Sequence, residues 1–200
     1  MLEMLFKGGW VMIPLAGCSL VAVTLIVERG LFFWRVGARQ PADEMITLVE
    51  RGRIAEALAK TEGVELPVVK VLKAGLDCRR APGRAMEAAG LAEVSAMKRG
   101  LTALETIVTL SPLLGLLGTI IGMIGSFQIM TFSGTSQPHA VTGGVAEALI
   151  ATASGITVAI LTLIPYNYFL RRVERETEAI EQYATRLELA FNGLSQERSA

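Results

Sequence analysis

Apolar residues are concentrated in three long stretches of this chain, and the segments between them carry nearly all of its charge. Residues 10–34 are apolar apart from a Glu-Arg pair, and two further apolar stretches, 107–130 and 145–170, flank a polar link at 131–142. A helix that crosses a bilayer needs about 20 apolar residues in sequence. The pattern therefore predicts three transmembrane helices, at about residues 9–34, 103–132 and 145–170. Trp10 and Trp34 are placed to anchor the first one at the two membrane surfaces.

The segment 35–105 has a different pattern, in which short apolar groups recur at helical spacing between charges. Pro41 and Pro67 each precede a helical pattern, and Gly52 separates two short helices. Pro82 and Gly83 indicate a turn, and we expect a helix over residues 84–104 after it. No run alternates between apolar and polar residues, so we expect no sheet. The chain is therefore predicted to be an all-α membrane protein with a helical soluble lobe.

The C-terminal segment, residues 171–200, continues the third helix with a regular apolar stripe. Its members stand seven residues apart, and they are Val173, Ile180, Leu187 and Leu194. Such a stripe is typical of an amphipathic helix that packs against another surface. We expect the third helix to extend from the membrane into the cytoplasm and its stripe to pack between subunits.

The charge distribution predicts the orientation. The lobe at 35–105 holds 12 of the 19 Lys and Arg residues, and the tail holds five, whereas the link holds none. Because basic segments stay on the cytoplasmic side, the N-terminus and the link are expected outside, with the lobe and the C-terminus inside. Four domains are expected: 1–34, the periplasmic N-terminus and first transmembrane helix; 35–105, the cytoplasmic lobe; 106–170, the transmembrane hairpin; and 171–200, the cytoplasmic C-terminal helix.

The first apolar stretch could instead be a cleaved signal peptide, since residues 15–18 match the cleavage box of a lipoprotein. The apolar run continues past Cys18, where a mature N-terminus would become polar. We therefore interpret the stretch as a membrane helix.

Composition narrows the function classes. Apolar residues make up 52% of the chain and charged residues 19%, and the mean hydropathy is +0.47. These values fit a membrane protein with a modest soluble part. Cys18, Cys78 and His139 stand far apart, so neither a disulfide nor a metal site is expected. There is no phosphate loop, and the membrane segments lack the paired acids or nucleophile–base pair of an intramembrane enzyme. We expect no enzyme activity and no cofactor.

The hairpin at 106–170 contains no Lys, Arg or Asp, and Glu147 is its one formal charge. An ionisable group inside an apolar span marks a candidate functional site. Glu147 could face a bundle interior and bind protons, or it could lie at the interface and reach water. At 100° per residue, Glu147 and Ser154 share a face, whereas Thr152 lies about 140° away. Either Glu147 and Thr152 therefore face different surfaces, or one of them does not line a pore.

Small residues mark a close contact within the hairpin. In the second helix the glycines recur at spacings of three and four residues, and a further one lies in the third helix: Gly115, Gly118, Gly122, Gly125 and Gly155. Glycine lets helix backbones approach closely in lipid, so we expect these residues to pack helices together. Thr119, on the same stripe, could equally bond back to the carbonyl of Gly115.

At these residues the chain resembles the MotA/TolQ/ExbB proton channel family, in its three-helix ExbB/TolQ branch. The matching stretches are residues 111–123 (SPLLGLLGTIIGM), 144–153 (GVAEALIATA) and Tyr166-Asn167. The resemblance implies a multi-pass subunit of the bacterial inner membrane, five copies of which form a ring around two single-span helices of an ExbD/TolR-like partner. It also implies that proton flow moves the partner and that a TonB/TolA-like protein carries the work to the outer membrane.

The resemblance assigns the family's membrane carboxylate to Glu147 and its two pore threonines to Thr119 and Thr152. The threonines would flank an aspartate that the partner supplies. The chain departs from the family pattern at residues 142–144, which read Thr-Gly-Gly instead of Ala-Pro-Gly, and at Pro165, which falls later than usual. The alternative function is a structural membrane scaffold that assembles an envelope complex without conducting protons.

Overall fold

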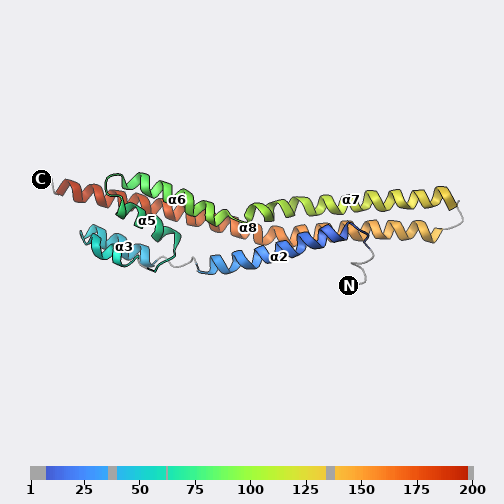
Figure 1. The fold of residues 1–200 in the computed structure, drawn as a ribbon, viewed down its shortest axis with the longest axis horizontal. Helices are drawn as coiled ribbons and strands as arrows, with labels where there is room; N and C mark the ends of the chain where they lie inside the picture. Colours follow the sequence, from blue (N-terminus) through green and yellow to red (C-terminus); the bar gives the residue numbers. More distant parts are fainter. Residues whose placement is uncertain (1–7, 36–39, 62, 134–137, 198–200) are drawn as a thin grey trace. The chain divides into compact units, whose positions relative to one another are not determined.

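The computed structural model describes residues 8–35, 40–61, 63–133 and 138–197, and every regular element in these ranges is a helix. The helices are α2 (Met12–Arg35), α3 (Gln40–Glu50), α4 (Ile54–Ala59), α5 (Pro67–Asp77), α6 (Pro82–Lys98), α7 (Leu101–Ser133) and α8 (Pro138–Glu197) (Figure 1). The all-α prediction is confirmed. The side chain of Leu194, the last residue of the predicted stripe, and that of His139 lie outside the described part.

Three helical stretches in the described ranges are long and apolar enough to cross a membrane, and they lie within residues 12–34, 82–131 and 142–193. Their large side chains are mostly exposed in the single chain, as Leu20, Leu113 and Ile164 illustrate. An apolar surface of this extent requires lipid or other protein chains around it. The structure therefore confirms three helices in the predicted regions that are long and apolar enough to cross a membrane.

Two boundaries differ from the sequence-based expectation. Pro82 does not form a turn before the helix; it occupies the start of α6, where a missing N–H costs nothing. The helix expected over 84–104 is broken at Gly100, whose φ of +79° is the left-handed conformation that glycine adopts readily. α6 therefore ends at Lys98, and α7 begins at Leu101.

α8 is a single helix of 60 residues that begins at Pro138 and passes through Pro165. The prediction that the third helix continues beyond the apolar stretch is confirmed. The polar link is shorter than expected, because residues 138–144 already belong to α8.

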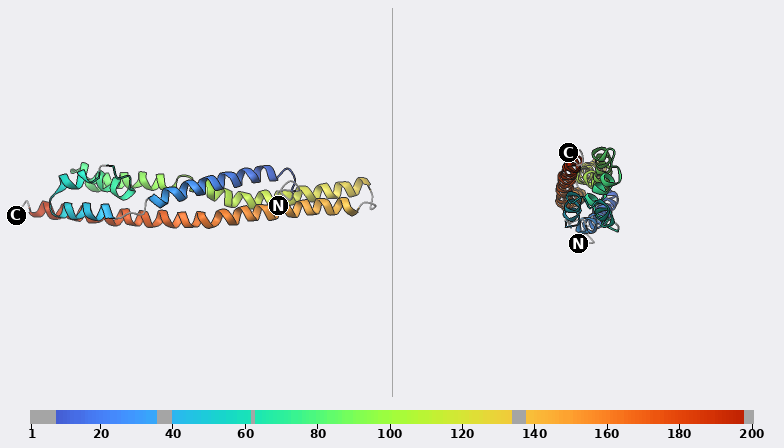
Figure 2. Two further views of the ribbon diagram at one scale, coloured as in Figure 1. Left: turned by 90° about the horizontal axis from the view of Figure 1, so that it is seen from below. Right: turned by 90° about the vertical axis from the view of Figure 1, so that its left-hand side faces the viewer.

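The chain forms two compact units. One comprises residues 1–29 and 100–168, and the other residues 30–99 and 169–200. We call them the hairpin unit and the charged unit. In the hairpin unit, α7 and the N-terminal part of α8 lie side by side and antiparallel, with α2 beside α8 (Figures 1 and 2).

The charged unit packs α3, α5 and α6 against the C-terminal part of α8, and α4 contacts α3 and α5. Val173, Ile180 and Leu187 of the apolar stripe are at most 5% exposed. A Cβ built at Gly75 of α5 would lie 3.3 Å from Leu187, and one at Gly90 of α6 would lie 3.5 Å from Ile180. The expectation that this stripe packs between subunits is therefore wrong: the stripe is used within the chain, against α5 and α6.

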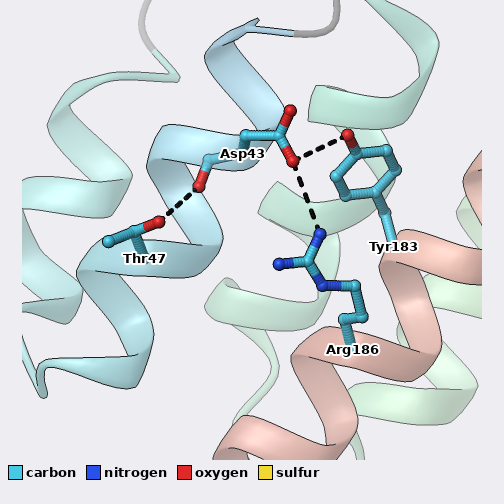
Figure 3. A network of polar contacts seen from close by, with 4 residues as sticks. All are labelled: Asp43, Thr47, Tyr183 and Arg186. Carbon is cyan, nitrogen blue, oxygen red and sulfur yellow. Dashed lines mark hydrogen bonds and ion pairs between the residues drawn. The ribbon is translucent and has the colours of Figure 1, made fainter.

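A polar contact joins α3 to α8 (Figure 3). The hydroxyl of Tyr183 donates to Asp43 Oδ1 at 2.8 Å, and Arg186 lies 3.4 Å from the same oxygen. The Thr47 hydroxyl donates to the backbone carbonyl of Asp43 at 2.9 Å. Asp43 thus connects α3 with the C-terminal part of α8.

Lys70 makes a second connection in the charged unit. Its Nζ lies 2.8 Å from Glu65, before α5, and 3.8 Å from Glu93 of α6. The hydrogen bond from Lys70 and its positive charge hold the pKa of Glu65 below the ordinary value. The same hydrogen bond raises the pKa of Lys70.

Candidate functional site

α7 and α8 approach each other through glycine and alanine. A Cβ built at Gly155 would lie 2.5 Å from the carbonyl oxygen of Ser111, and one at Gly118 would lie 2.5 Å from the Cβ of Ala151. At Gly122 the neighbour is Ala148, at 2.9 Å. Real Cβ atoms do not approach this closely, so the two backbones touch where the sequence predicted small-residue packing.

Gly115 belongs to this contact and Gly125 does not. A Cβ at Gly115 would meet the backbone of Ala151 and Thr152 at 3.1 Å, whereas one at Gly125 would have nothing within 4 Å. Gly144, which was not predicted to pack, takes the place in this contact nearest to the link instead. A Cβ there would collide with Ser126 Oγ and lie 3.2 Å from the carbonyl oxygen of Gly122. The signal for Gly144 was its four-residue spacing to Ala148.

The two threonines are both hydrogen-bonded to backbone carbonyls. Thr152 Oγ1 donates to the carbonyl oxygen of Gly115 on α7 at 3.0 Å, and so ties the two helices together. Thr119 Oγ1 donates to the carbonyl of Leu116 within its own helix at 2.7 Å. The local bond of Thr119 is the kind considered from the sequence, but its acceptor is the carbonyl of Leu116, whereas the carbonyl of Gly115 accepts from Thr152.

Thr119 and Thr152 lie close to the same level of the helix pair. Gly118 contacts Ala151, and each threonine follows one of these two residues by a single position. In an antiparallel pair this places the threonines within about one helical turn of each other along the axis. Both side chains are half-buried in the single chain.

Glu147 lies apart from this level, by five residues or about 7.5 Å along α8 in the direction of the link. Its side chain is exposed in the single chain and turns to the segment that enters α2. Gly9, at the start of that segment, has a φ of +74°, and a Cβ there would collide with Glu147 Oε1. Sequence reasoning missed Gly9, since only the tertiary contact connects it with the carboxylate.

Ser154 shares the α2-facing side of α8 with Glu147. It lines a groove of about 340 Å³ together with Val158 and residues of α2, among them Leu15 and Ser19. Thr152 turns instead to α7. Of the two alternatives left by the sequence, the structure thus supports the first: Glu147 and Thr152 face different surfaces, because each residue of a helix is rotated by 100°.

At the level of Thr119 and Thr152, the polar side-chain groups of α7 and α8 are hydroxyls, and no formal charge lies there. Each hydroxyl hydrogen is engaged by a carbonyl, so the oxygen lone pairs are what remains for another group. In this arrangement both threonines can accept a hydrogen bond. Within the part of the chain that the structure describes, no three His, Cys, Asp or Glu side chains converge, so we derive no metal site there.

Comparison with known proteins gives a consistent result. The sequence profile of the MotA/TolQ/ExbB proton channel family matches residues 65–182, which include both halves of the α7–α8 contact. Over nearly its whole length the chain is similar to a biopolymer transport protein of Synechocystis sp., ExbB-like 3. The two are 38% identical over 193 residues, which cover 92% of this chain and 91% of that protein.

Two further relatives match over shorter stretches of the chain. The biopolymer transport protein ExbB of Salmonella typhimurium is 42% identical over 77 residues, covering 38% of this chain and 32% of that protein. The Tol-Pal system protein TolQ of Haemophilus influenzae is 35% identical over 99 residues, covering 50% of this chain and 42% of that protein.

Proposed function

Because the chain belongs to the MotA/TolQ/ExbB proton channel family as an ExbB/TolQ-like biopolymer transport protein, we propose that it is the stator subunit of a proton-driven motor. In this proposal five copies form a ring in the bacterial inner membrane, with the N-terminus outside and the C-terminus in the cytoplasm. The ring encloses single-span helices of an ExbD/TolR-like partner, and proton flow moves the partner against the ring. A TonB/TolA-like protein receives the work.

The observation that carries the proposal is the pair of threonine hydroxyls at one level of the α7–α8 pair, where no formal charge lies. Two hydroxyls at one level can form hydrogen bonds with a titrating acid, but neither threonine is itself such an acid. In the proposal the single-span partner supplies that acid from its own chain.

The hydrogen bonds indicate how the threonines would act. While Thr119 and Thr152 donate to the carbonyls of Leu116 and Gly115, their oxygens accept, and they favour the protonated, neutral form of a partner's carboxylic acid. If a threonine releases its carbonyl, it can donate to the carboxylate. Exchange between these two patterns would connect the protonation of the partner's acid with the α7–α8 contact.

The energy available suits such a step. One elementary charge that crosses about 100 mV yields about 2.3 kcal/mol. An interhelical hydrogen bond in a membrane contributes about 0.6 kcal/mol on average. A single proton can therefore offset the loss of the Thr152–Gly115 bond and bias the movement of the partner.

The decisive experiment measures proton flux through the complex of this protein with its single-span partner in liposomes. We expect Thr152→Val and Glu147→Gln each to lower the flux at least tenfold, while Thr152→Ser, which keeps the hydroxyl, retains most of it. Native mass spectrometry of each complex establishes that the subunits still assemble. Undiminished flux in assembled Glu147→Gln and Thr152→Val complexes would refute the roles of both residues.

A complex that assembles but passes no protons, even as wild type, would instead favour the structural scaffold. The two candidate functions therefore differ in a single measurement.

A further inference from the structure

The charged unit carries a groove that the proposed channel does not use. It runs between α6 and the C-terminal part of α8 and has a volume of about 430 Å³. Its α6 side extends from Gly83 to Val94, which corresponds to about three helical turns. A groove of this length and form suits one further helix laid against the pair.

The floor of the groove is apolar. Met86 and Ile180 are buried at its base, and Leu91 projects into it with 70% of its surface exposed. Single exposed leucines are common on protein surfaces, but this one shares the groove with Met86, Val94, Ile180 and Ala184. The floor can therefore take up the apolar face of an amphipathic helix.

The rim of the groove is acidic. Glu87, Glu181 and Glu188 line it, and no Lys or Arg is among its lining residues. Glu188 lies over Gly83 at the start of α6, where a negative charge is favourable. Glu87 and Glu181 are exposed and make no ion pair with any other described residue. The rim thus favours a positively charged occupant.

A second copy of this chain is a poor occupant. The large apolar side chains that the described charged unit exposes are Leu31, Trp34, Leu91 and Leu189, and the first two lie in the candidate membrane span of α2. A neighbouring charged unit could offer only one leucine at a time to a groove that is three turns long. The occupant is thus expected to come from a different chain.

From this surface we infer that the α6–α8 groove binds a basic amphipathic helix, about three turns long, from the cytoplasmic segment of the single-span partner. A protein that crosses the membrane once carries an excess of Lys and Arg on its cytoplasmic flank, so its charge complements the acidic rim. The identity of the partner rests on the proposed function, whereas the chemistry of the occupant rests on the groove. Such a contact would attach the partner to the stator outside the membrane.

The groove is tested with the full-length protein in nanodiscs of phosphatidylcholine and a fluorescent 14-residue peptide of Lys and Leu, with Leu at helical spacing. Fluorescence anisotropy gives the dissociation constant, and empty nanodiscs measure the partition of the peptide into lipid. We expect saturable binding in excess of that partition, and at least tenfold weaker binding to Leu91→Ser and to the double variant Glu87→Gln/Glu181→Gln.

Two matched variants serve as controls. Leu189→Ser removes an equally exposed leucine outside the groove, and Glu178→Gln removes an exposed charge of α8 that does not line it. Both should bind the peptide like wild type, and a Glu/Leu peptide should not bind. Equal affinity across all variants, or equal binding of the acidic peptide, would overturn the inference. This result does not depend on proton flux, so it fails separately from the proposed function.

The occupant is identified by a photocrosslinking amino acid placed at Leu91 in cells that produce the complex. We expect adducts whose mass-spectrometric mapping leads to the segment on the cytoplasmic side of the partner's membrane span. Adducts only between two copies of this chain, or a Leu91→Ser variant that loses its oligomer without any change in peptide binding, would assign the groove to the ring interface and contradict the inference.

Discussion

Among single residues, Gly9 and Glu147 form the contact with the clearest consequence for the proposed channel. Gly9 combines a left-handed backbone with the absence of room for a Cβ, and the obstacle is the carboxylate of Glu147. The side chain that carries the hairpin's one formal charge is therefore positioned in part by the segment that leads into α2. Its rotamer depends on a residue almost 140 positions away in the sequence.

We expect Gly9→Ala to displace the Glu147 carboxylate and to lower proton flux in the assembled complex several-fold. Gly52→Ala is the matched control, since Gly52 has a φ of +73° and a Cβ there would meet nothing within 4 Å. Both variants should lose about 1 kcal/mol of stability through backbone strain. Flux is measured in liposomes, and equal flux in the two variants would show that the Gly9 contact does not position Glu147.

At the scale of helices, the α7–α8 contact stabilises the hairpin unit and the α3–α8 contact stabilises the charged unit, by different means. The first is a close approach of backbones that leaves no space for side chains. The second depends on a carboxylate with two donors from one helix. The hairpin unit is therefore sensitive to added volume, and the charged unit to the loss of polar groups.

Gly155→Ala should destabilise the hairpin unit by about 1–3 kcal/mol, because the new Cβ would press on backbone atoms of α7 that cannot turn away. Gly125→Ala should be neutral or stabilising, since alanine favours a helix by up to about 1 kcal/mol over glycine and the site is open. Thermal unfolding in detergent compares them. A shift of the same sign and size in both would exclude close backbone packing as the cause.

Tyr183→Phe should destabilise the charged unit by about 1–2 kcal/mol, because it leaves Asp43 without its shorter hydrogen bond. Arg186→Met should cost less than about 1 kcal/mol, since that ion pair is exposed and long. Protease cleavage near α3, followed over a urea series, measures both. A larger effect of Arg186→Met than of Tyr183→Phe would reverse this order of importance.

At the scale of the whole molecule, the exposed apolar faces of the hairpin unit and the internal packing of the charged unit predict which unit joins the subunits of the proposed ring. The stripe of α8 is already buried by α5 and α6, so it is not available to a neighbouring subunit. We expect the hairpin unit to supply most of the contacts between subunits.

Native mass spectrometry of the purified protein should give a mass near five times 21.4 kDa. Leu187→Ala should lower the stability of the charged unit by about 2–5 kcal/mol, since Leu187 is 1% exposed, but should leave this mass unchanged. Dissociation of the pentamer while circular dichroism still reports a folded chain would return the stripe to a role between subunits.

Periodicity and composition sufficed for the membrane helices, the all-α class and the separation of Glu147 from Thr152, because these depend on residues close together in one helix. The seven-residue spacing of apolar residues also predicted that α8 continues past its apolar stretch. The break at Gly100 was not, since a single glycine can be tolerated within a helix. The sequence also does not tell whether Gly125 or Gly144 packs between the helices, because that depends on how α7 and α8 are rotated relative to each other.

The sequence by itself determined which segments are apolar, which charge is isolated and which hydroxyls accompany it, since each is a property of local composition. Tertiary structure decided the partners: Thr152 with Gly115, Glu147 with Gly9, and Leu187 with α5. A hydroxyl, a carboxylate or an apolar stripe has several possible partners of equal chemistry. Only the packing of distant segments selects among them, because it decides which of those partners comes within contact distance.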